Sequence, residues 1–204
     1  MELDHLAVSG ETLEAAVEHV ESALGVRMQP GGKHALFGTW NRLLGLGEGL
    51  YLEAIAVDPV APPPGRARWF GLDDFAGPAR LTNWICRTHD IEAELATCTE
   101  KAGGAVAVSR GDLSWRITVP DDGQMPFDGA FPAFIEWEGT AHPSVTLSDS
   151  GCVLRQLTVA SPDAAALSEI MRRRVTDPRI RIESGPVPEF LAEFDTPAGV
   201  RSLQ

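Results

Sequence analysis

The sequence predicts an α+β protein built from tandem βαβββ modules, with curved mixed sheets that enclose a cleft. Strand-like and helix-like segments repeat in the same order twice, and a third, shortened βαββ copy follows. The 204 residues are 44% hydrophobic and 23% charged, as is typical of a chain that buries a core. Each copy is too small to bury its sheet face alone. We therefore expect the copies to pair through these faces as one compact unit.

The first module is expected over residues 1–58. Its opening strand, residues 2–8, is short and alternates apolar side chains. A helix follows from Thr12, which can cap its N-terminus, to Gly25, which can end it in a left-handed conformation. The remaining strands are predicted on either side of a glycine-rich turn, over residues 34–46 and 50–57.

A connector rich in proline and glycine is expected over residues 59–80. Trp69 and Phe70 inside it indicate a loop packed on the body of the protein rather than a free tether. The second module is expected over residues 81–140. Its elements are a strand over 81–87, a helix over 90–102 and strands over 105–109, 113–119 and 131–137.

The partial third module is expected over residues 151–204. It begins with a strand over 152–159. Ser161-Pro162-Asp163 then opens a helix, with proline at the first position, where its missing N–H is not needed. Two strands, over 179–184 and 189–195, complete the copy as βαββ.

Charge and motif content exclude several classes of function. With 17 Lys+Arg against 29 Asp+Glu, the net charge of −12 argues against a nucleic-acid or anionic-membrane partner. No apolar stretch approaches a membrane span, and the acidic N-terminus is unlike a signal peptide. The three cysteines show no CxxC spacing, so we expect a reducing, cytoplasmic protein.

The repeat register brings a few polar residues into corresponding positions. In the first strands of the three copies, the same place is taken by His5, Asn83 and Gln156. In the last strands of the first two copies, Glu53 and Glu136 occupy corresponding positions. A histidine and a glutamate on one concave sheet face would form half of a metal site, and their donor atoms suit Zn, Mn, Fe, Ni or Co.

These residues also have purely structural interpretations. His5 could be satisfied by backbone hydrogen bonds. Glu53 could form an ion pair across its hairpin, and Glu136 could pair with Arg87 or Arg116 across the sheet. A charge in an otherwise apolar strand needs such a partner or a metal, because burying it alone is costly.

Two further residues of the first module are candidate contacts to a bound molecule. His34 follows a pair of glycines on a loop that leads into a strand, and loops at cavity mouths often touch ligands. Asn41, with Thr39 two residues before it in the strand predicted over 34–46, is the second candidate. The structural alternatives are a solvent-exposed loop residue for His34 and a strand hydrogen bond for Asn41.

Several stretches of the sequence are similar to those of a known family. They are Leu3-Asp4-His5-Leu6, Gly31-Gly32-Lys33-His34, Gly38-Thr39-Trp40-Asn41-Arg42-Leu43-Leu44, Tyr51-Leu52-Glu53, Phe134-Ile135-Glu136-Trp137 and His142-Pro143. The chain resembles the glyoxalase-like domain proteins of the vicinal oxygen chelate superfamily over roughly residues 2–165. The resemblance implies paired modules around a cleft and, in metal-using members, a divalent ion that chelates two adjacent substrate oxygens.

The superfamily's metal ligands lie on the first and last strands of the modules. Mapped onto this chain, the resemblance implies His5 and Glu53 as ligands, with Gln156 or Asn83 and Glu136 as candidates for the rest. The chain departs from the pattern because asparagine is not a usual ligand and Ala192 replaces the acid of the third copy. Metal-free members that only sequester ligands also exist.

Two functions follow as hypotheses. The first is a divalent-metal-dependent lyase, isomerase or dioxygenase-type enzyme acting on a small oxygenated substrate, with Glu53 or Glu136 as ligand or proton-transfer base. Its predicted metal ligands are His5, Glu53, Glu136 and Gln156, and its predicted substrate contacts are His34, Asn41 and Asn83. The alternative is a metal-free small-molecule binding protein, which the tryptophan-rich strands favour. A pure assembly module with a filled cleft is a third alternative, and the oligomeric state stays open, with a homodimer among the options.

Overall fold

The computed structural model describes residues 1–204 as three consecutive modules. The first contains β1 (Glu2–Ser9), α1 (Leu13–Leu24), β2 (Gln29–His34), β3 (Thr39–Gly45) and β4 (Tyr51–Val57). The second contains β5 (Arg80–Arg87), α2 (Ile91–Ala96), β6 (Gly104–Arg110), β7 (Leu113–Val119) and β8 (Ala133–Trp137). The third contains β9 (Val153–Ser161), α4 (Ala164–Arg172), β10 (Ile180–Ser184), β11 (Glu189–Thr196) and β12 (Gly199–Leu203). Short helical turns, η1 (Trp69–Gly71) and α3 (Pro143–Thr146), lie in the connections.

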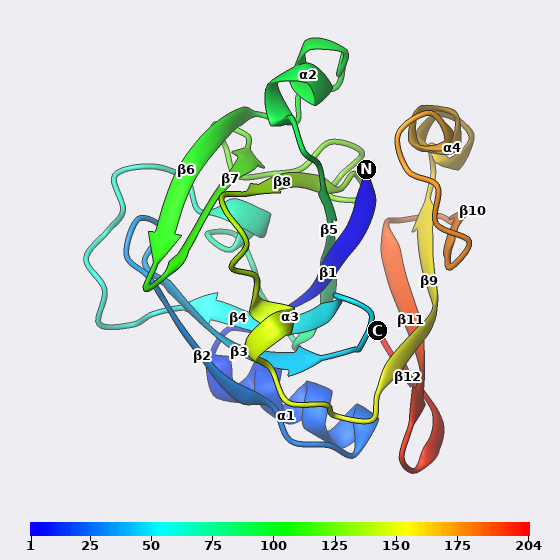
Figure 1. Ribbon diagram of the computed structural model, residues 1–204. Coiled ribbons are helices and arrows are strands. Elements are labelled where there is room, and N and C mark those ends of the chain that lie inside the picture. The colour runs from blue at the N-terminus through cyan, green and yellow to red at the C-terminus, as the bar shows by residue number, and fades with distance from the viewer.

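The α+β class and the modular architecture are confirmed. The first two modules form one curled sheet of eight strands, in the order β2-β3-β4-β1-β5-β8-β7-β6 (Figure 1). Within each half, the first and last strands pair in parallel, and the two halves join where β1 pairs antiparallel with β5. The first strands of both modules therefore lie side by side at the centre of the sheet, with the remaining strands curling away on either side.

The first helix follows the local rules that the sequence suggested. Thr12 Oγ1 accepts a hydrogen bond from the backbone N–H of Ala15, 3.1 Å away, and so caps the N-terminus. Gly25 ends the helix at φ 72°, a conformation that a residue with a side chain rarely adopts. The apolar stripe of α1 is buried against β4, which fixes the helix on the outer face of the curled sheet.

Three elements differ from the predicted boundaries. The stretch predicted as one strand over 34–46 turns after His34, so that β2 and β3 form a hairpin. Helix α2 ends at Ala96 rather than continuing to 102, because Thr97 turns its hydroxyl back to the carbonyl of Glu94, 3.1 Å away. The third module carries one strand more than predicted, β12, which pairs with β11.

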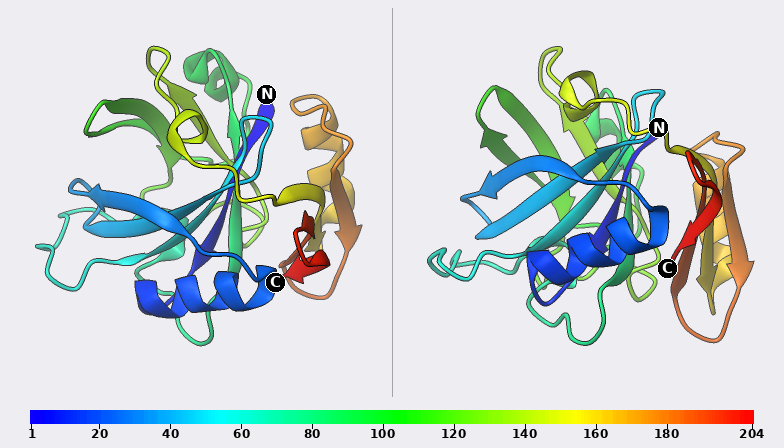
Figure 2. Two further views of the ribbon diagram at one scale, coloured as in Figure 1. Left: turned by 60° about the horizontal axis from the view of Figure 1, so that its bottom comes forward. Right: turned by 90° about the horizontal axis from the view of Figure 1, so that it is seen from below.

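The third module forms a separate sheet of four strands, in the order β10-β9-β11-β12. It stands beside the curled sheet, where β11 packs against β5 and β12 packs against α1 (Figure 2). Buried side chains at alternate positions of β9 and β11, such as Leu157 and Ala192, join the same hydrophobic core as the first two modules. The three modules therefore share one core.

The connector between the first two modules is packed on both halves of the curled sheet. The Trp69 ring stacks on Phe37, in the turn between β2 and β3, with ring centroids 4.0 Å apart. The backbone N–H of Gly71 donates to the carbonyl of Gly123, beyond β7, at 2.9 Å. Because it touches both halves, this segment helps to close the cleft. None of the helices has the length and apolar character needed to cross a membrane.

Candidate functional site

The cleft of the curled sheet holds a small pocket with polar groups on one side and apolar rings on the other. Its volume is about 20 Å³, which is room for about one water molecule. The polar side comes from the first module and the tip of β6, and the apolar side from η1, β7 and β8. The lining residues are His5, His34, Asn41, Leu43, Tyr51, Glu53, Trp69, Phe70, Arg110, Trp115, Ile117, Ile135 and Trp137.

A β-bulge in β1 places two neighbouring side chains in contact. The pairing of β1 with β5 shifts between Leu3 and His5, so Asp4 does not alternate to the opposite face as a regular strand would require. Asp4 Oδ1 instead lies 2.6 Å from His5 Nδ1. Both residues are buried, and Asp4 is completely inaccessible. The bulge thus creates a carboxylate–imidazole pair that the alternation rule does not predict.

The second oxygen of Asp4 has its own partners. Trp137 Nε1 donates to Asp4 Oδ2 at 3.1 Å, and His142 Nε2 lies 3.1 Å from the same atom. Burial alone would raise the pKa of the Asp4 carboxyl, but the hydrogen bonds with His142 and His5 outweigh burial and hold that pKa well below its ordinary value. Asp4 is therefore a buried, ionised group that fixes the orientation of the His5 ring.

Glu53 faces His5 from the neighbouring strand. Its Oε2 atom lies 3.8 Å from His5 Nε2, and both side chains are buried. The other oxygen, Oε1, accepts a hydrogen bond from Asn41 Nδ2. Tyr51, two residues before Glu53 on the same face of β4, stacks on the His5 ring at a centroid distance of 4.4 Å. One carboxylate oxygen is thus held in place, and the other is left facing the imidazole.

Asn41 also joins a second set of polar side chains, Arg110 and His34. Arg110 NH1 lies 3.0 Å from Asn41 Oδ1 and 3.0 Å from His34 Nε2, to which it donates. The proton of His34 is then on Nδ1, which lies 3.0 Å from Thr39 Oγ1. Burial, with the Arg110 charge adding to it, lowers the pKa of His34 to about 3. His34 is therefore a neutral ring that orients Arg110.

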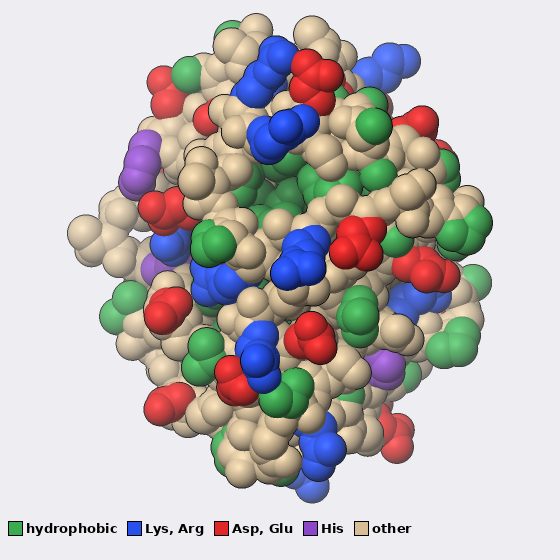
Figure 3. Space-filling model, turned by 90° about the vertical axis from the view of Figure 1, so that its right-hand side faces the viewer, with side chains coloured by type: hydrophobic (Ala, Val, Ile, Leu, Met, Phe, Trp, Pro, Cys, Tyr) green, Lys and Arg blue, Asp and Glu red, His purple; other side chains and the backbone are tan.

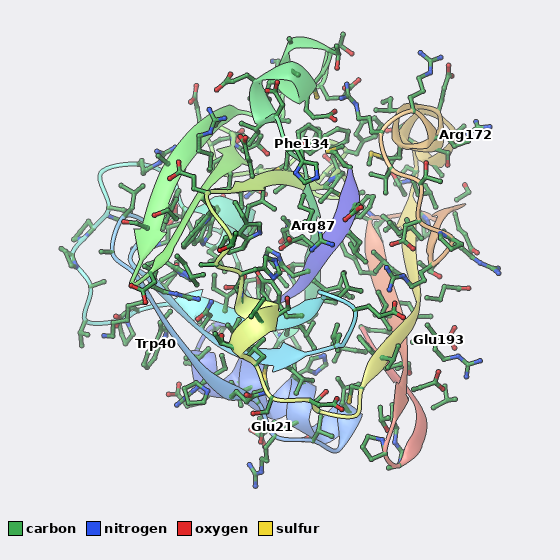
Figure 4. The ribbon with its side chains drawn as sticks, viewed as in Figure 1. Glu21, Trp40, Arg87, Phe134, Arg172 and Glu193 are labelled. Carbon is green, nitrogen blue, oxygen red and sulfur yellow. The ribbon has the colours of Figure 1, made fainter.

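The neighbours of these residues in sequence point elsewhere. Side chains alternate along β3, so Thr39 and Asn41 are buried on the cleft side while Trp40 lies near Leu13 at the start of α1 (Figure 4). The same rule governs β8, where Ile135 and Trp137 line the pocket. Phe134, labelled in Figure 4, lies under the Arg174 guanidinium at 5.8 Å.

The structure does not bring Glu136 to His5 and Glu53. Because Ile135 and Trp137 face the cleft, Glu136 between them faces the other way, where Arg116 donates to its carboxylate. The sequence alignment matched Glu136 of β8 to Glu53 of β4 and was wrong by one residue. A shift of one residue along a strand moves every side chain to the opposite face. Of the two interpretations given by the sequence, the ion pair with Arg116 is the one that the structure contains.

Gln156 and Asn83 also lie outside this cluster. Gln156 is on β9 of the second sheet, where its amide donates to Thr158 Oγ1 at 3.0 Å. Asn83 is on β5 but lines a different cavity, between the curled sheet and the second sheet. Of the seven residues predicted from sequence, four converge in the cleft: His5, His34, Asn41 and Glu53.

The donor set in the cleft does not fit a metal ion held by the protein. His5 and Glu53 supply one nitrogen and one oxygen, and the third possible ligand in the pocket, His34 Nε2, already accepts from Arg110. Protein metal sites ordinarily use three or more free donors. No group of three His, Cys, Asp or Glu residues in the structure is arranged to hold an ion. The opposite wall offers Ile117, Ile135 and aromatic rings, none of which is a ligand.

Sequence reasoning missed Asp4 and Arg110. Asp4 stands beside His5 in the same strand, but only the bulge turns it inward, and no residue type in β1 marks a bulge. Arg110 precedes Gly111, whose φ of 57° forms the turn between β6 and β7. Arg110 falls between the strands predicted over 105–109 and 113–119, and the closure of the curled sheet is what carries it to the first module.

Comparisons with known proteins place this geometry in context. A family model described as a glyoxalase-like domain matches residues 3–175. A hypothetical protein from Staphylococcus aureus shares 17% identity, with 92% of this chain and 88% of that one covered and a TM-score of 0.65. Methylmalonyl-CoA epimerase from Mycobacterium tuberculosis shares 18% identity over 68% of this chain and 88% of its own, with a TM-score of 0.45. No curated protein matches the sequence significantly.

Proposed function

The chain belongs to the glyoxalase-like domain family of the vicinal oxygen chelate superfamily, and from this premise we propose that it is a lyase- or isomerase-type enzyme. In this proposal Glu53 takes a proton from a small oxygenated substrate bound in the cleft, and His5 is its partner in proton transfer. The observation that carries the proposal is that His5 Nε2 and Glu53 Oε2 face each other across 3.8 Å in a buried pocket.

The two oxygens of Glu53 have different tasks. Oε1 is held by the amide of Asn41, whose own Oδ1 accepts from the backbone N–H of Gly32 at 2.8 Å and from Arg110. Oε2 has no comparable donor and is the oxygen that can accept a proton. A base held at one oxygen and open at the other is oriented before the substrate arrives.

The reaction is proton transfer next to a carbonyl or hydroxyl group. A C–H bond loses its proton to Glu53 Oε2, and its electron pair moves to the adjacent carbonyl, whose oxygen becomes the enolate oxygen. Arg110 lines the same pocket and supplies a fixed positive charge for that oxygen. The proton then returns to the neighbouring carbon in an isomerisation, or to a leaving oxygen in a lyase reaction, with His5 Nε2 on the opposite side of the pocket as the second proton carrier.

The proposed steps use no divalent ion, because His5 and Glu53 supply two free donor atoms rather than a full ligand set. The Asp4–His5 pair supports this assignment. Asp4 accepts from His5 Nδ1 at 2.6 Å and so directs Nε2 toward Glu53. A buried carboxylate that orients an imidazole is a recurrent arrangement in acid–base sites.

Substrate binding requires the cleft to open. A pocket of about 20 Å³ cannot hold even a three-carbon molecule, and the rings of Trp69 and Phe70 fill the space beside it. Phe70 has φ 59°, a conformation that costs a bulky residue about 1–3 kcal/mol. We therefore propose that the segment around η1 moves when substrate enters, because relief of this strain favours an alternative conformation.

Solvent isotope exchange tests the proposal on a panel of candidate substrates. The wild-type protein is incubated in D₂O with small 2-hydroxy and 2-oxo carboxylic acids, hydroxyketones and hemithioacetals, and carbon-bound deuterium is measured by NMR. We expect exchange with at least one of these compounds, unchanged by a chelator and lost in Glu53→Gln. Exchange that persists in Glu53→Gln contradicts the proposal. So does stoichiometric divalent metal in the purified protein that is lost in His5→Ala and Glu53→Ala.

The metal-free binding protein remains the second candidate. It is favoured by the apolar wall of the pocket, where Trp115 and Trp137 stand with ring centroids 5.3 Å apart. A ligand that binds with no isotope exchange at any carbon, in both the wild type and Glu53→Gln, supports binding alone. In either case the three free cysteines support the expectation of a reducing, cytoplasmic environment.

A further inference from the structure

A second and much larger cavity lies where the curled sheet meets the second sheet. Its volume is about 600 Å³, within the range of small-molecule sites. The start of β5 forms one wall, and β9 and β11 form the other, with the segments around Phe70 and Met125 between them. Phe70 is the one residue that also lines the cleft, so the two spaces are separate sites.

Asn83 carries an unused polar group in this cavity. The residue is 3% exposed, and its Oδ1 atom is buried without a hydrogen-bond partner. Buried polar groups in native proteins are nearly always hydrogen-bonded, because an unpaired one destabilises the fold. Neighbouring Thr82, in contrast, is satisfied by Ser9 at 2.7 Å. The unpaired amide of Asn83 therefore marks a position where a partner from outside the chain belongs.

The charges around the cavity restrict that partner. Asp74, Asp128 and Glu189 line it, and Arg80 is the one basic lining residue. The Arg80 guanidinium already donates to the carbonyls of Ala76 and Pro78, at 3.0 and 3.1 Å, and lies 4.3 Å from the centre of the Phe75 ring. With three carboxylates against one guanidinium, the lining is net negative, so the cavity disfavours an anion and accepts a neutral or positively charged molecule.

The apolar part of the lining restricts it further. Phe70, Met125 and Phe190 are buried residues whose side chains border the cavity. Flat apolar molecules gain most from such walls. The face of the protein that carries the second sheet shows hydrophobic side chains at the bottom of a hollow between charged ones (Figure 3). Solvent therefore reaches hydrophobic side chains on the face that carries the second sheet.

We propose that this cavity is a second ligand site for a small molecule with an aromatic or other flat apolar body and an N–H donor, neutral or cationic, which donates to Asn83. The site contains neither His5 nor Glu53, and Phe70 is the residue that the two spaces share. Asn83 is thus assigned to a ligand, but to one bound outside the His5–Glu53 cleft.

Three probes of one shape test the charge and donor requirements together. They are 2-naphthamidine, 2-naphthamide and 2-naphthoate, titrated into the full chain by calorimetry. We expect the amidine and the amide to bind and the carboxylate to bind at least about tenfold more weakly, because it lacks the donor and meets three carboxylates. Equal or tighter binding of 2-naphthoate overturns the proposal, as does the absence of binding by all three at millimolar concentration.

Two variants locate the binding. Asn83→Leu removes the acceptor, and Leu191→Trp, at a half-buried β11 position that lines the cavity, fills part of the space and leaves Asn83 in the sequence. Each should weaken 2-naphthamide binding by about tenfold or more. In the wild type, backbone amide signals of residues 80–83 and 124–129 should shift on titration. Unchanged affinity in both variants, or shifts confined to the strands that carry His5 and Glu53, would assign the probe to the cleft and reject the second site.

Discussion

The cleft of the curled sheet and the cavity beside the second sheet are opposite kinds of space. In the cleft, Asp4, His5, Asn41 and Glu53 are joined by hydrogen bonds or face one another, and almost no room is left. In the cavity, room is plentiful and the amide oxygen of Asn83 has no partner. Polar groups packed together and open volume therefore point to different roles. A connected buried network indicates prepared chemistry, whereas an unpaired buried acceptor beside an open space indicates recognition.

The largest expected effect is at Glu53. Glu53→Gln keeps the shape and the contact with Asn41 but removes the base, so proton exchange should fall by about 10²–10⁴-fold. Glu136→Gln is the matched control, because Glu136 lies on the opposite face of the sheet in an ion pair with Arg116. It should retain activity within about twofold. Equal losses in both variants would mean that the cleft has no special role.

The next effect is at the carboxylate that orients His5. Asp4→Asn removes a buried charge that meets His5, Trp137 and His142, and it should lower the free energy of unfolding by about 2–4 kcal/mol. Because the ring of His5 loses its orientation, kcat should fall about 10²-fold or more while KM changes little. Urea denaturation and steady-state kinetics measure the two effects. A stable variant with full kcat would make Asp4 a packing residue.

The buried ring of His34 gives a pH dependence of known sign. Its pKa is about 3 in the folded chain, against 6.5 for an ordinary histidine, so between these values only the unfolded state binds the proton. The stability that the neutral ring provides is present above pH 6.5 and is lost as the pH falls toward 3. From about pH 6 to about pH 4, the free energy of unfolding should therefore decrease by about 1.4 kcal/mol per pH unit from this group.

Substitution separates this slope from that of other groups. His34→Gln should remove it, whereas His89→Gln, at an exposed position, should leave the pH dependence of the wild type. Carboxylates with lowered pKa, such as Asp4, contribute mainly below about pH 5, and this contribution is common to the wild type and both variants. Urea titrations at about pH 4, 5, 6 and 7 measure the slopes. Parallel curves for His34→Gln and the wild type would contradict the assignment of a neutral buried ring.

The smallest expected effect is a gain of stability in the cavity. Asn83→Leu replaces an unpaired buried amide by an apolar group, and it should raise the free energy of unfolding by about 1 kcal/mol, or Tm by about 2–4 °C. Thr82→Val is the control, because it breaks the hydrogen bond with Ser9 and should lower Tm. A lower Tm in Asn83→Leu would show that the amide is already satisfied in solution.

The fold could be predicted because its signal is repeated. Two βαβββ patterns give the same answer independently, and the error at each strand boundary does not alter the order of elements. The residues that converge on the first half of the cleft were also within reach. His5, Asn41 and Glu53 lie on three strands of one module, and the pairing of β1 and β3 with β4 is regular there, so alternation and register decide which side chains share a face.

The rest depended on features that a single sequence does not display. Glu136 was aligned one residue out of phase, and such a slip reverses the face without changing the hydrophobic pattern noticeably. Gln156 occupies the corresponding strand of a module that forms a separate sheet. Asp4 turns inward at a bulge, and Arg110 reaches the cleft through closure of the whole curled sheet. Each is set by tertiary structure rather than by local pattern.

The phase of β8 has a consequence for what this scaffold could become. Ile135, and not Glu136, occupies the inward place across from His5 and Glu53. Ile135→His would add a second imidazole to the existing nitrogen and oxygen donors, and the chain should then retain about one divalent ion per molecule after dialysis, measured by elemental analysis. Under the proposed function, a single aliphatic side chain thus separates general-base chemistry from metal coordination in this chain, which makes position 135 a starting point for engineering.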